Sequence, residues 1–185
     1  MKIFVNKEIG TLVHIYSFLN GGYFASNNQL FYYNEKAYQL YSNNKKDELL
    51  NIYNNLKIQI PNYVLSHIER SAGIRYFCCD GCHDAEIKFA SYKNGVLSIE
   101  LDLAGMLGCL NIKNNSCVVK IKTKSTEVAD YLINDVEVFD NLIWLNNEIS
   151  FDENNVYFDL EIQAFKNQTH ENIKYQFIIE DISIE

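Results

Sequence analysis

Hydrophobic and polar residues alternate along most of the second half of the chain. Apolar residues recur at every second position from Ala85 to Phe89 and again from Leu97 to Leu103. A period of two is typical of a β-strand that buries one face. We therefore expect a β-hairpin in this part of the chain.

The match of apolar residues across that hairpin predicts its loop. A two-residue turn at Asn94-Gly95 would place Leu101 opposite Lys88, a charged residue. A three-residue loop over 93–95 keeps apolar residues together and gives Gly95 the left-handed position of a bulged loop. The pattern favours this longer loop, with the pairs Ile87–Leu101 and Phe89–Ile99.

Two further loops connect three strands nearer the C-terminus. A loop at 152–155 predicts the pairs Phe151–Val156 and Ile149–Phe158. A loop at 167–170 predicts the pairs Ala164–Ile173, Ile162–Tyr175, Leu160–Phe177 and Phe158–Ile179. These registers give three strands one continuous apolar face, which must be buried.

Helical periodicity is clearest before residue 73. Leu49, Tyr53 and Leu56 share one side of a predicted helix Asp47–Ile58, which Asp47 can cap. A second helix, Asn62–Ala72, follows Pro61, and Gly73 is placed to end it. We also expect an edge strand at Lys2–Val5 and a hairpin over 108–124 that turns near Asn114-Asn115. The segments 6–44 and 127–140 have no decisive pattern.

These elements predict an α+β fold in one domain of 185 residues. Residues 1–84 form a mixed part with two helices, and residues 85–185 form an antiparallel β-sheet of hairpins. We expect the N-terminal helical region to pack on one face of that sheet.

The chain shows no signal-peptide pattern and no run of about 18 apolar residues, which a membrane span needs. We therefore expect a cytoplasmic protein without membrane association, whose five cysteines are reduced. The sequence does not set the oligomeric state.

Acidic residues gather at the C-terminal end. Residues 125–185 contain 14 acidic residues against Lys166 and Lys174, while the net charge of the whole chain is −8. Such a surface repels phosphate backbones, so nucleic acid is a poor partner. A basic protein or a cation fits it better.

The segment 78–84 reads Cys-Cys-Asp-Gly-Cys-His-Asp and is the richest in metal-ligand residues. Zinc could be held by Cys79, Cys82 and His83, with Cys78 or Asp84 as a fourth ligand. Zinc sites usually need a second, distant pair of ligands, and Cys109 and Cys117 fall on opposite faces of their predicted hairpin. We therefore expect no cofactor, and a zinc-binding protein is the alternative hypothesis.

His83-Asp84 directly precedes the predicted β-meander. This arrangement resembles uncharacterised bacterial families in which "LHD" or "FHD" opens such strands, and some of these are similar to immunity proteins of toxin systems. The resemblance covers about the middle quarter of the chain and implies a protein that holds a toxin. From the residues alone, the pair is expected to make local turn and capping hydrogen bonds.

The predicted registers place three acidic residues on the face opposite the apolar one. These are Glu148, Asp159 and Glu161, with Glu148 directly across from Asp159. Like charges in that position are mildly destabilising and are tolerated more readily where something, such as a basic partner, gains from them. The alternative is an acidic solvated face that only keeps the protein soluble. We find no phosphate-binding loop, nucleophile elbow or paired metal-binding histidines. The sequence therefore favours a non-enzymatic protein-binding module for a basic partner, such as a toxin.

Overall fold

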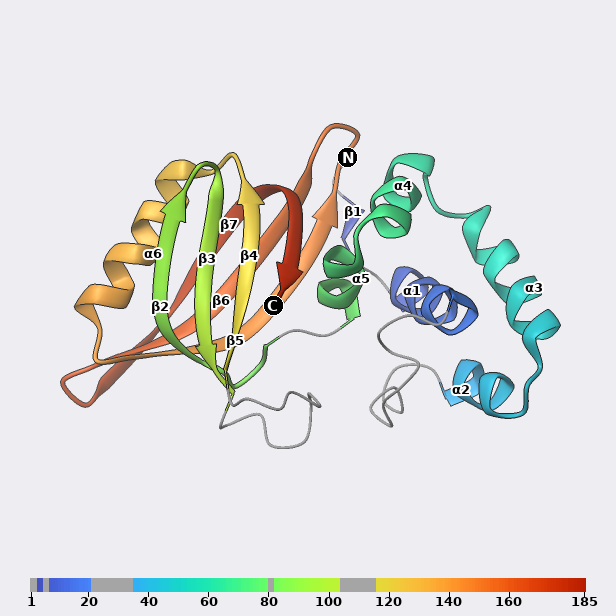
Figure 1. Cartoon of the computed structure of the whole chain (residues 1–185), viewed down its shortest axis with the longest axis horizontal. Coiled ribbons are helices and arrows are strands. Elements are labelled where there is room, and N and C mark those ends of the chain that lie inside the picture. The colour runs from blue at the N-terminus through green and yellow to red at the C-terminus, as the bar shows by residue number, and fades with distance from the viewer. Residues whose placement is uncertain (1–2, 5–6, 21–34, 80–81, 104–115) are drawn as a thin grey trace. The chain divides into compact units, whose positions relative to one another are not determined.

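The protein has an α+β fold, as the sequence predicts (Figure 1). A computed structural model describes residues 3–4, 7–20, 35–79, 82–103 and 116–185. The chain divides into two compact units. One comprises Val5–Cys79, and the other comprises Asp80–Glu185 together with Met1–Phe4. Their boundary lies close to the point where the periodicity changes from helical to alternating.

The N-terminal unit is helical. Its helices are α1 (Lys7–Asn20), α2 (Glu35–Ser42), α3 (Lys46–Lys57), α4 (Asn62–Arg70) and α5 (Ala72–Cys79). The first helix packs against α2, α3 and α5, so it is central to this unit. The predicted helices 47–58 and 62–72 correspond to α3 and α4, whereas α1 and α2 lie in the segment 6–44, where the pattern was not decisive.

The end of α4 differs from the prediction. The helix stops at Arg70, and Ser71 adopts an extended conformation. The Ser71 hydroxyl accepts a hydrogen bond from the backbone N–H of Ile74 at 3.0 Å and so caps the start of α5. Gly73 therefore lies in the first turn of a new helix and does not end the old one.

The C-terminal unit is a sheet with one helix. Its strands are β1 (Ile3–Phe4), β2 (Glu86–Lys93), β3 (Val96–Asp102), β4 (Ser116–Thr123), β5 (Asn141–Phe151), β6 (Val156–Lys166) and β7 (Thr169–Ile184). All pairings are antiparallel, and β1 is an edge strand beside β5. Helix α6 (Thr126–Val138) lies between β4 and β5 in the chain, in the segment that the pattern left open.

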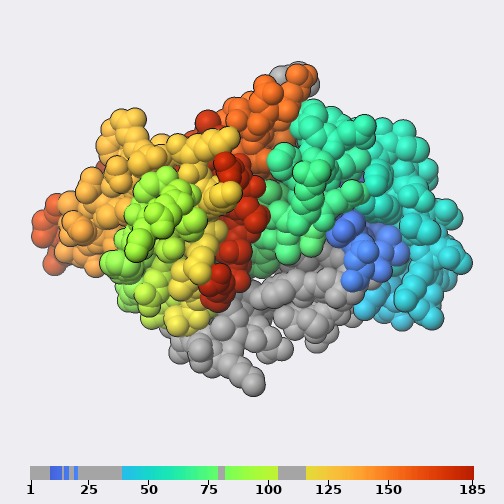
Figure 2. All heavy atoms as spheres, turned by 45° about the horizontal axis from the view of Figure 1, so that its top comes forward, coloured from blue at the N-terminus to red at the C-terminus, as the bar shows by residue number. Residues whose placement is uncertain are grey.

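The six strands β2 to β7 form a closed ring. Their order is β5-β2-β3-β4-β7-β6, and β6 pairs again with β5. The seam between β2 and β5 is short and contains the pair Glu86–Ile143. Beside this pair, Trp144 N donates a hydrogen bond to the Ala85 carbonyl at 2.9 Å, and Asp84 N donates one to the Trp144 carbonyl at 2.8 Å. Figure 2 shows the outer surfaces of β2, β3, β4 and the end of β7 side by side.

The hairpin β2–β3 corrects the predicted loop. The turn has two residues, Asn94 and Gly95, with φ of 53° and 80°. This turn places Phe89 opposite Glu100, and a β-bulge between Ile87 and Phe89 then restores the predicted pair Ile87–Leu101. Phe89 is consequently 55% exposed. Phe89 therefore gains only part of the free energy of about 1.5–3 kcal/mol that full burial of a large apolar side chain provides.

The C-terminal registers are correct for one hairpin and shifted for the next. Phe151 pairs with Val156 and Glu148 with Asp159, as predicted. Between β6 and β7 the turn is only Asn167-Gln168, both with positive φ. The true pairs are therefore displaced by two residues, for example Leu160–Tyr175 and Phe158–Phe177. A shift of two keeps every side chain on its predicted face.

Helix α6 packs on β2 and β7 of its own unit (Figure 1). Ala129 and Leu132 are fully buried. The Ser125 hydroxyl accepts a hydrogen bond from Ile178 N at 2.8 Å, and Tyr175 donates to the Asp135 carboxylate. Burial and that carboxylate raise the pKa of Tyr175 well above its usual range. The predicted packing of helices 47–58 and 62–72 on the sheet concerns both units and stays a prediction.

The loop between β5 and β6 is organised by Asp152. Its carboxylate accepts a hydrogen bond from the Tyr157 hydroxyl at 2.6 Å and from the backbone N–H groups of Asn154 and Asn155, each at 2.8 Å. The Tyr157 bond is the largest influence, and together these bonds lower the pKa of Asp152 to about 2. Hydrogen bonds to a carboxylate favour its charged form.

We expect the Asp152 carboxyl carbon to titrate with a midpoint of about 2 in NMR. The Tyr157→Phe variant should raise this midpoint, because it removes the strongest donor. Since the folded pKa is depressed, the stabilising contribution is complete above the unfolded pKa of about 4 and is lost as the pH falls toward 2. An unshifted midpoint in the wild type would contradict the loop geometry.

In the part of the chain that the structure describes, no helix has the length and apolar character needed to cross a membrane.

Candidate functional site

The predicted acidic residues lie together on the outer side of β5 and β6. Glu148 and Asp159 face each other across the strands, and Glu161 follows two residues later on β6. We call Glu148, Asp159 and Glu161 the acidic strand face. They border a shallow, open hollow of about 250 Å³, which also reaches Lys174 and Gln176 of β7. A β-bulge between Trp144 and Asn146 adjoins this hollow.

The three carboxylates differ in how many hydrogen bonds and ion pairs they form within the protein. Glu161 forms an ion pair with Lys174 at 3.3 Å and accepts a hydrogen bond from Asn172 at 3.3 Å. Asp159 accepts a hydrogen bond from Gln176. Glu148 is exposed, and among the described residues no hydrogen bond or ion pair of its carboxylate is found. The uncompensated charge therefore centres on Glu148 and Asp159.

Other acidic residues near the C-terminus form ion pairs with lysines of the neighbouring strand β4. Lys122 of β4 pairs with Glu180 of β7 at 2.6 Å, and Lys120 of β4 pairs with Glu185, the residue after β7, at 2.5 Å. The Glu180 carboxylate holds the pKa of Lys122 above its usual value, mainly through this hydrogen bond. Lysines therefore neutralise part of the acidic excess of the C-terminal end. The acidic strand face keeps more uncompensated negative charge than the paired strands β4 and β7 do.

The cysteine-rich segment 78–84 contains both buried and exposed side chains. Cys82 is buried and hydrogen-bonds to the thiol of Cys117 on β4, an interaction that lowers the pKa of Cys117. His83 lies at the surface. Cys79 ends α5, and its side chain is outside the described residues, as is Cys109. The described residues contain no group of three His, Cys, Asp or Glu side chains that could hold a metal ion. Zinc binding by Cys79, Cys82 and His83 stays a prediction.

His83 and Asp84 form an exposed local pair. The His83 Nδ1 and Asp84 Oδ2 atoms are 3.0 Å apart. Asp84 has a positive φ of 66°, and its backbone N–H donates a hydrogen bond to the Trp144 carbonyl. In this geometry the pair occupies the turn that leads the chain into the seam between β2 and β5.

Two members of these sites were missed by sequence reasoning. The predicted register placed Lys174 opposite Gln163, so its pairing with Glu161 was not foreseen. Cys117 was assigned to a hairpin with Cys109, whereas its thiol contacts Cys82. The alternation of β4 does place Cys117 on the same face as Val119 and Ile121, and that signal identifies it as an inward residue.

Comparison with protein-family models, curated proteins and solved structures finds no match for this chain.

Proposed function

We propose that the protein is a non-enzymatic binding module that holds a basic partner protein through the acidic strand face, in the manner of an immunity protein that holds a toxin. The observation that carries this proposal is the cross-strand pair Glu148–Asp159, which places two like charges opposite each other, with Glu148 exposed and Asp159 half-buried. Such a pair is destabilising in the free protein, and a basic partner relieves it.

The surroundings of the pair support a protein partner. The hollow is open and shallow, and its border combines carboxylates with the amides of Asn146, Asn147 and Gln176. Charged and amide groups of this kind suit a polar protein interface. Charge complementarity would raise the rate of association with a basic surface.

The test is affinity capture from cells that make the protein, with quantitative mass spectrometry of what is bound. The wild type should enrich a basic protein, and the variant Glu148→Lys/Asp159→Lys/Glu161→Lys should retain it about tenfold less. Each exposed ion pair contributes up to about 1 kcal/mol, and charge reversal replaces attraction by repulsion at three positions.

A matched control reverses two exposed carboxylates elsewhere. Asp47→Lys/Glu48→Lys changes the net charge through the first turn of α3, in the other unit. This control should capture the same partner as the wild type. Equal capture by all three proteins, or equal loss in both variants, would refute the proposal. The effect should also be larger for Glu148→Lys alone than for Glu161→Lys, because Lys174 already compensates Glu161.

A further inference from the structure

Helix α6 leaves apolar side chains in water on its solvent side. Tyr131 is 55% exposed and Val138 is 51% exposed. They are seven residues apart, so they lie on the same side of the helix with an axial separation of about 10 Å. Ala129 and Leu132 already fill the buried side. The exposed pair is therefore not needed to attach α6 to the ring.

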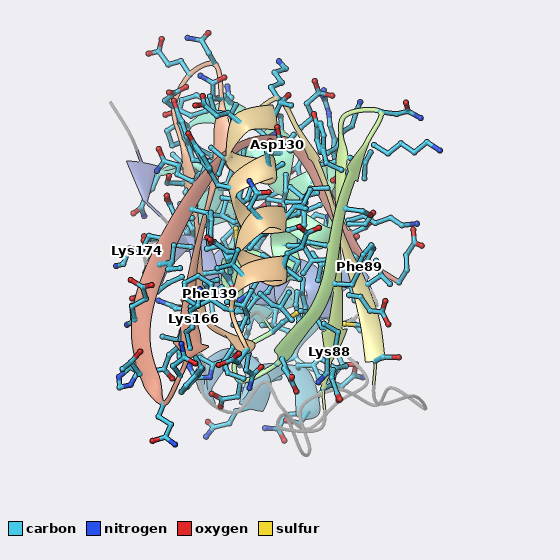
Figure 3. The ribbon with its side chains drawn as sticks, turned by 90° about the vertical axis from the view of Figure 1, so that its left-hand side faces the viewer. Lys88, Phe89, Asp130, Phe139, Lys166 and Lys174 are labelled. Carbon is cyan, nitrogen blue, oxygen red and sulfur yellow. The ribbon has the colours of Figure 1, made fainter. Side chains whose placement is uncertain are left out.

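Phe89 of β2 is also exposed, but it lies on the face of this strand opposite to Ala90 and Tyr92, and the Tyr92 hydroxyl lies 3.3 Å from Thr126 Oγ1 at the start of α6. Regular alternation would turn Phe89 inward with Ile87. The β-bulge turns it outward instead, so that Lys88 and Phe89 are both exposed. Bulges that re-aim a side chain are typical of functional surfaces. Figure 3 views the unit from the side of α6, with β2 along one flank of the helix and β7 along the other, and Phe89 on the side of β2 away from the helix.

The charge of α6 is wholly acidic. The helix carries Glu127, Asp130, Asp135 and Glu137 and no basic residue. Glu127, Asp130 and Glu137 are exposed, while Asp135 accepts the hydrogen bond from Tyr175. Glu137 lies in the last turn, where the helix dipole disfavours negative charge. Nearby Lys88 pairs with Glu86 at 2.5 Å, so its charge is already engaged.

From these observations we infer that the outer side of α6, with Tyr131 and Val138 as apolar contacts and Glu127 and Asp130 as charged contacts, is a second docking surface. Its occupant is a basic amphipathic segment of another protein, with apolar side chains set among lysines or arginines. Exposed apolar residues surrounded by charge mark such interfaces.

Charge decides between this occupant and two others. A second copy of the chain docked through the same surface would bring the α6 carboxylates of both copies together, because a two-fold interface contacts itself. Anionic lipid would be repelled in the same way. A basic protein segment alone satisfies both the apolar and the acidic side chains. The inference shares with the proposed function only the positive charge of the partner, since the acidic strand face belongs to β5 and β6.

The test uses the full chain and a defined probe. The probe is a fluorescein-labelled synthetic helix of 13 residues, the length of α6, with two leucines seven residues apart and lysines on the opposite side. A control peptide has serine in place of both leucines. Fluorescence anisotropy should give an affinity about tenfold higher for the leucine peptide, because its leucines meet Tyr131 and Val138.

Two α6 variants locate the binding surface. Tyr131→Ser/Val138→Ser should reduce the affinity for the leucine peptide to that for the serine peptide, and Glu127→Lys/Asp130→Lys should weaken both peptides about tenfold. All four residues are exposed or half-exposed, and circular dichroism checks that the variants fold. Phe89→Ser should change the affinity for either peptide less than about twofold, because Phe89 lies on the other face of β2.

Glu148→Lys separates this inference from the proposed function. It should change peptide affinity less than about twofold, because the acidic strand face is not part of the docking surface. Equal binding of both peptides, absence of binding, or a larger loss from Glu148→Lys than from the α6 variants would overturn the inference. That last result would leave the acidic strand face as the binding surface.

Discussion

Replacing Trp144 by alanine should destabilise the C-terminal unit by about 3–5 kcal/mol. The indole is fully buried, and its ring centroid lies 5.9 Å from that of Phe158. Its Nε1–H donates a hydrogen bond to Asn147 at 3.2 Å, which alanine cannot replace. Trp144 also supplies the backbone bonds of the seam that closes the ring. A cavity at this position loosens the core and the closure together.

Urea unfolding followed by circular dichroism measures this effect, since the variant lacks the only tryptophan of the chain. Phe89→Ala is the matched control, because Phe89 is an aromatic residue on a strand of the same closed sheet but is 55% exposed. Its free energy of unfolding should change by no more than about 0.5 kcal/mol. A loss below about 1 kcal/mol for Trp144→Ala would contradict the closed, packed ring.

The second large effect concerns α6. Leu132→Ala should cost about 2–5 kcal/mol, because Leu132 is fully buried where the helix packs on the sheet. Wild-type Trp144 lies in the same unit, so its fluorescence reports the unfolding of this unit. The transition should move to lower urea concentration with an unchanged slope, as expected for a loss of stability alone.

The neighbouring residue provides the control for α6. Tyr131→Ser changes a side chain that is 55% exposed and donates only a surface hydrogen bond to Glu127 at 3.0 Å. The free energy of unfolding of this variant should differ from that of the wild type by less than about 0.5 kcal/mol. If both variants shifted the transition equally, α6 would not contribute the buried face described above.

The sequence predicted the strands well where alternation is regular. It gave the β5–β6 register and the inward faces of β6 and β7, because burying one face of a strand fixes the parity of its side chains. It failed where a turn or bulge changes the count by one or two. Gln168 at φ of 67° is an unusual turn residue, so the two-residue turn at 167–168 had no sequence signal.

Long-range features also escaped prediction. The seam between β2 and β5 and the pairing of β4 with β7 join strands that are distant in the chain, and no local pattern records them. The helix α6 contains several β-branched residues, which weaken its helical signal. Its helicity therefore depends on its packing against β2 and β7.

The candidate site was predicted in part. The pair Glu148–Asp159 follows from the correct β5–β6 register. The ion pair between Glu161 and Lys174 was not predicted, because the predicted β6–β7 register differed from the true one by two residues and placed Lys174 opposite Gln163. Phe89 was assigned to the core because alternation alone does not reveal a bulge.

The most direct test of the binding proposal is the association rate of the captured basic partner, measured by stopped-flow at about 50 and about 500 mM salt. We expect the rate constant to fall about tenfold or more between these conditions, and Glu148→Lys/Asp159→Lys to reduce it at low salt while Asp47→Lys/Glu48→Lys does not. A rate that is independent of salt and unchanged by reversing Glu148 and Asp159 would contradict the proposal that the acidic strand face holds a basic protein.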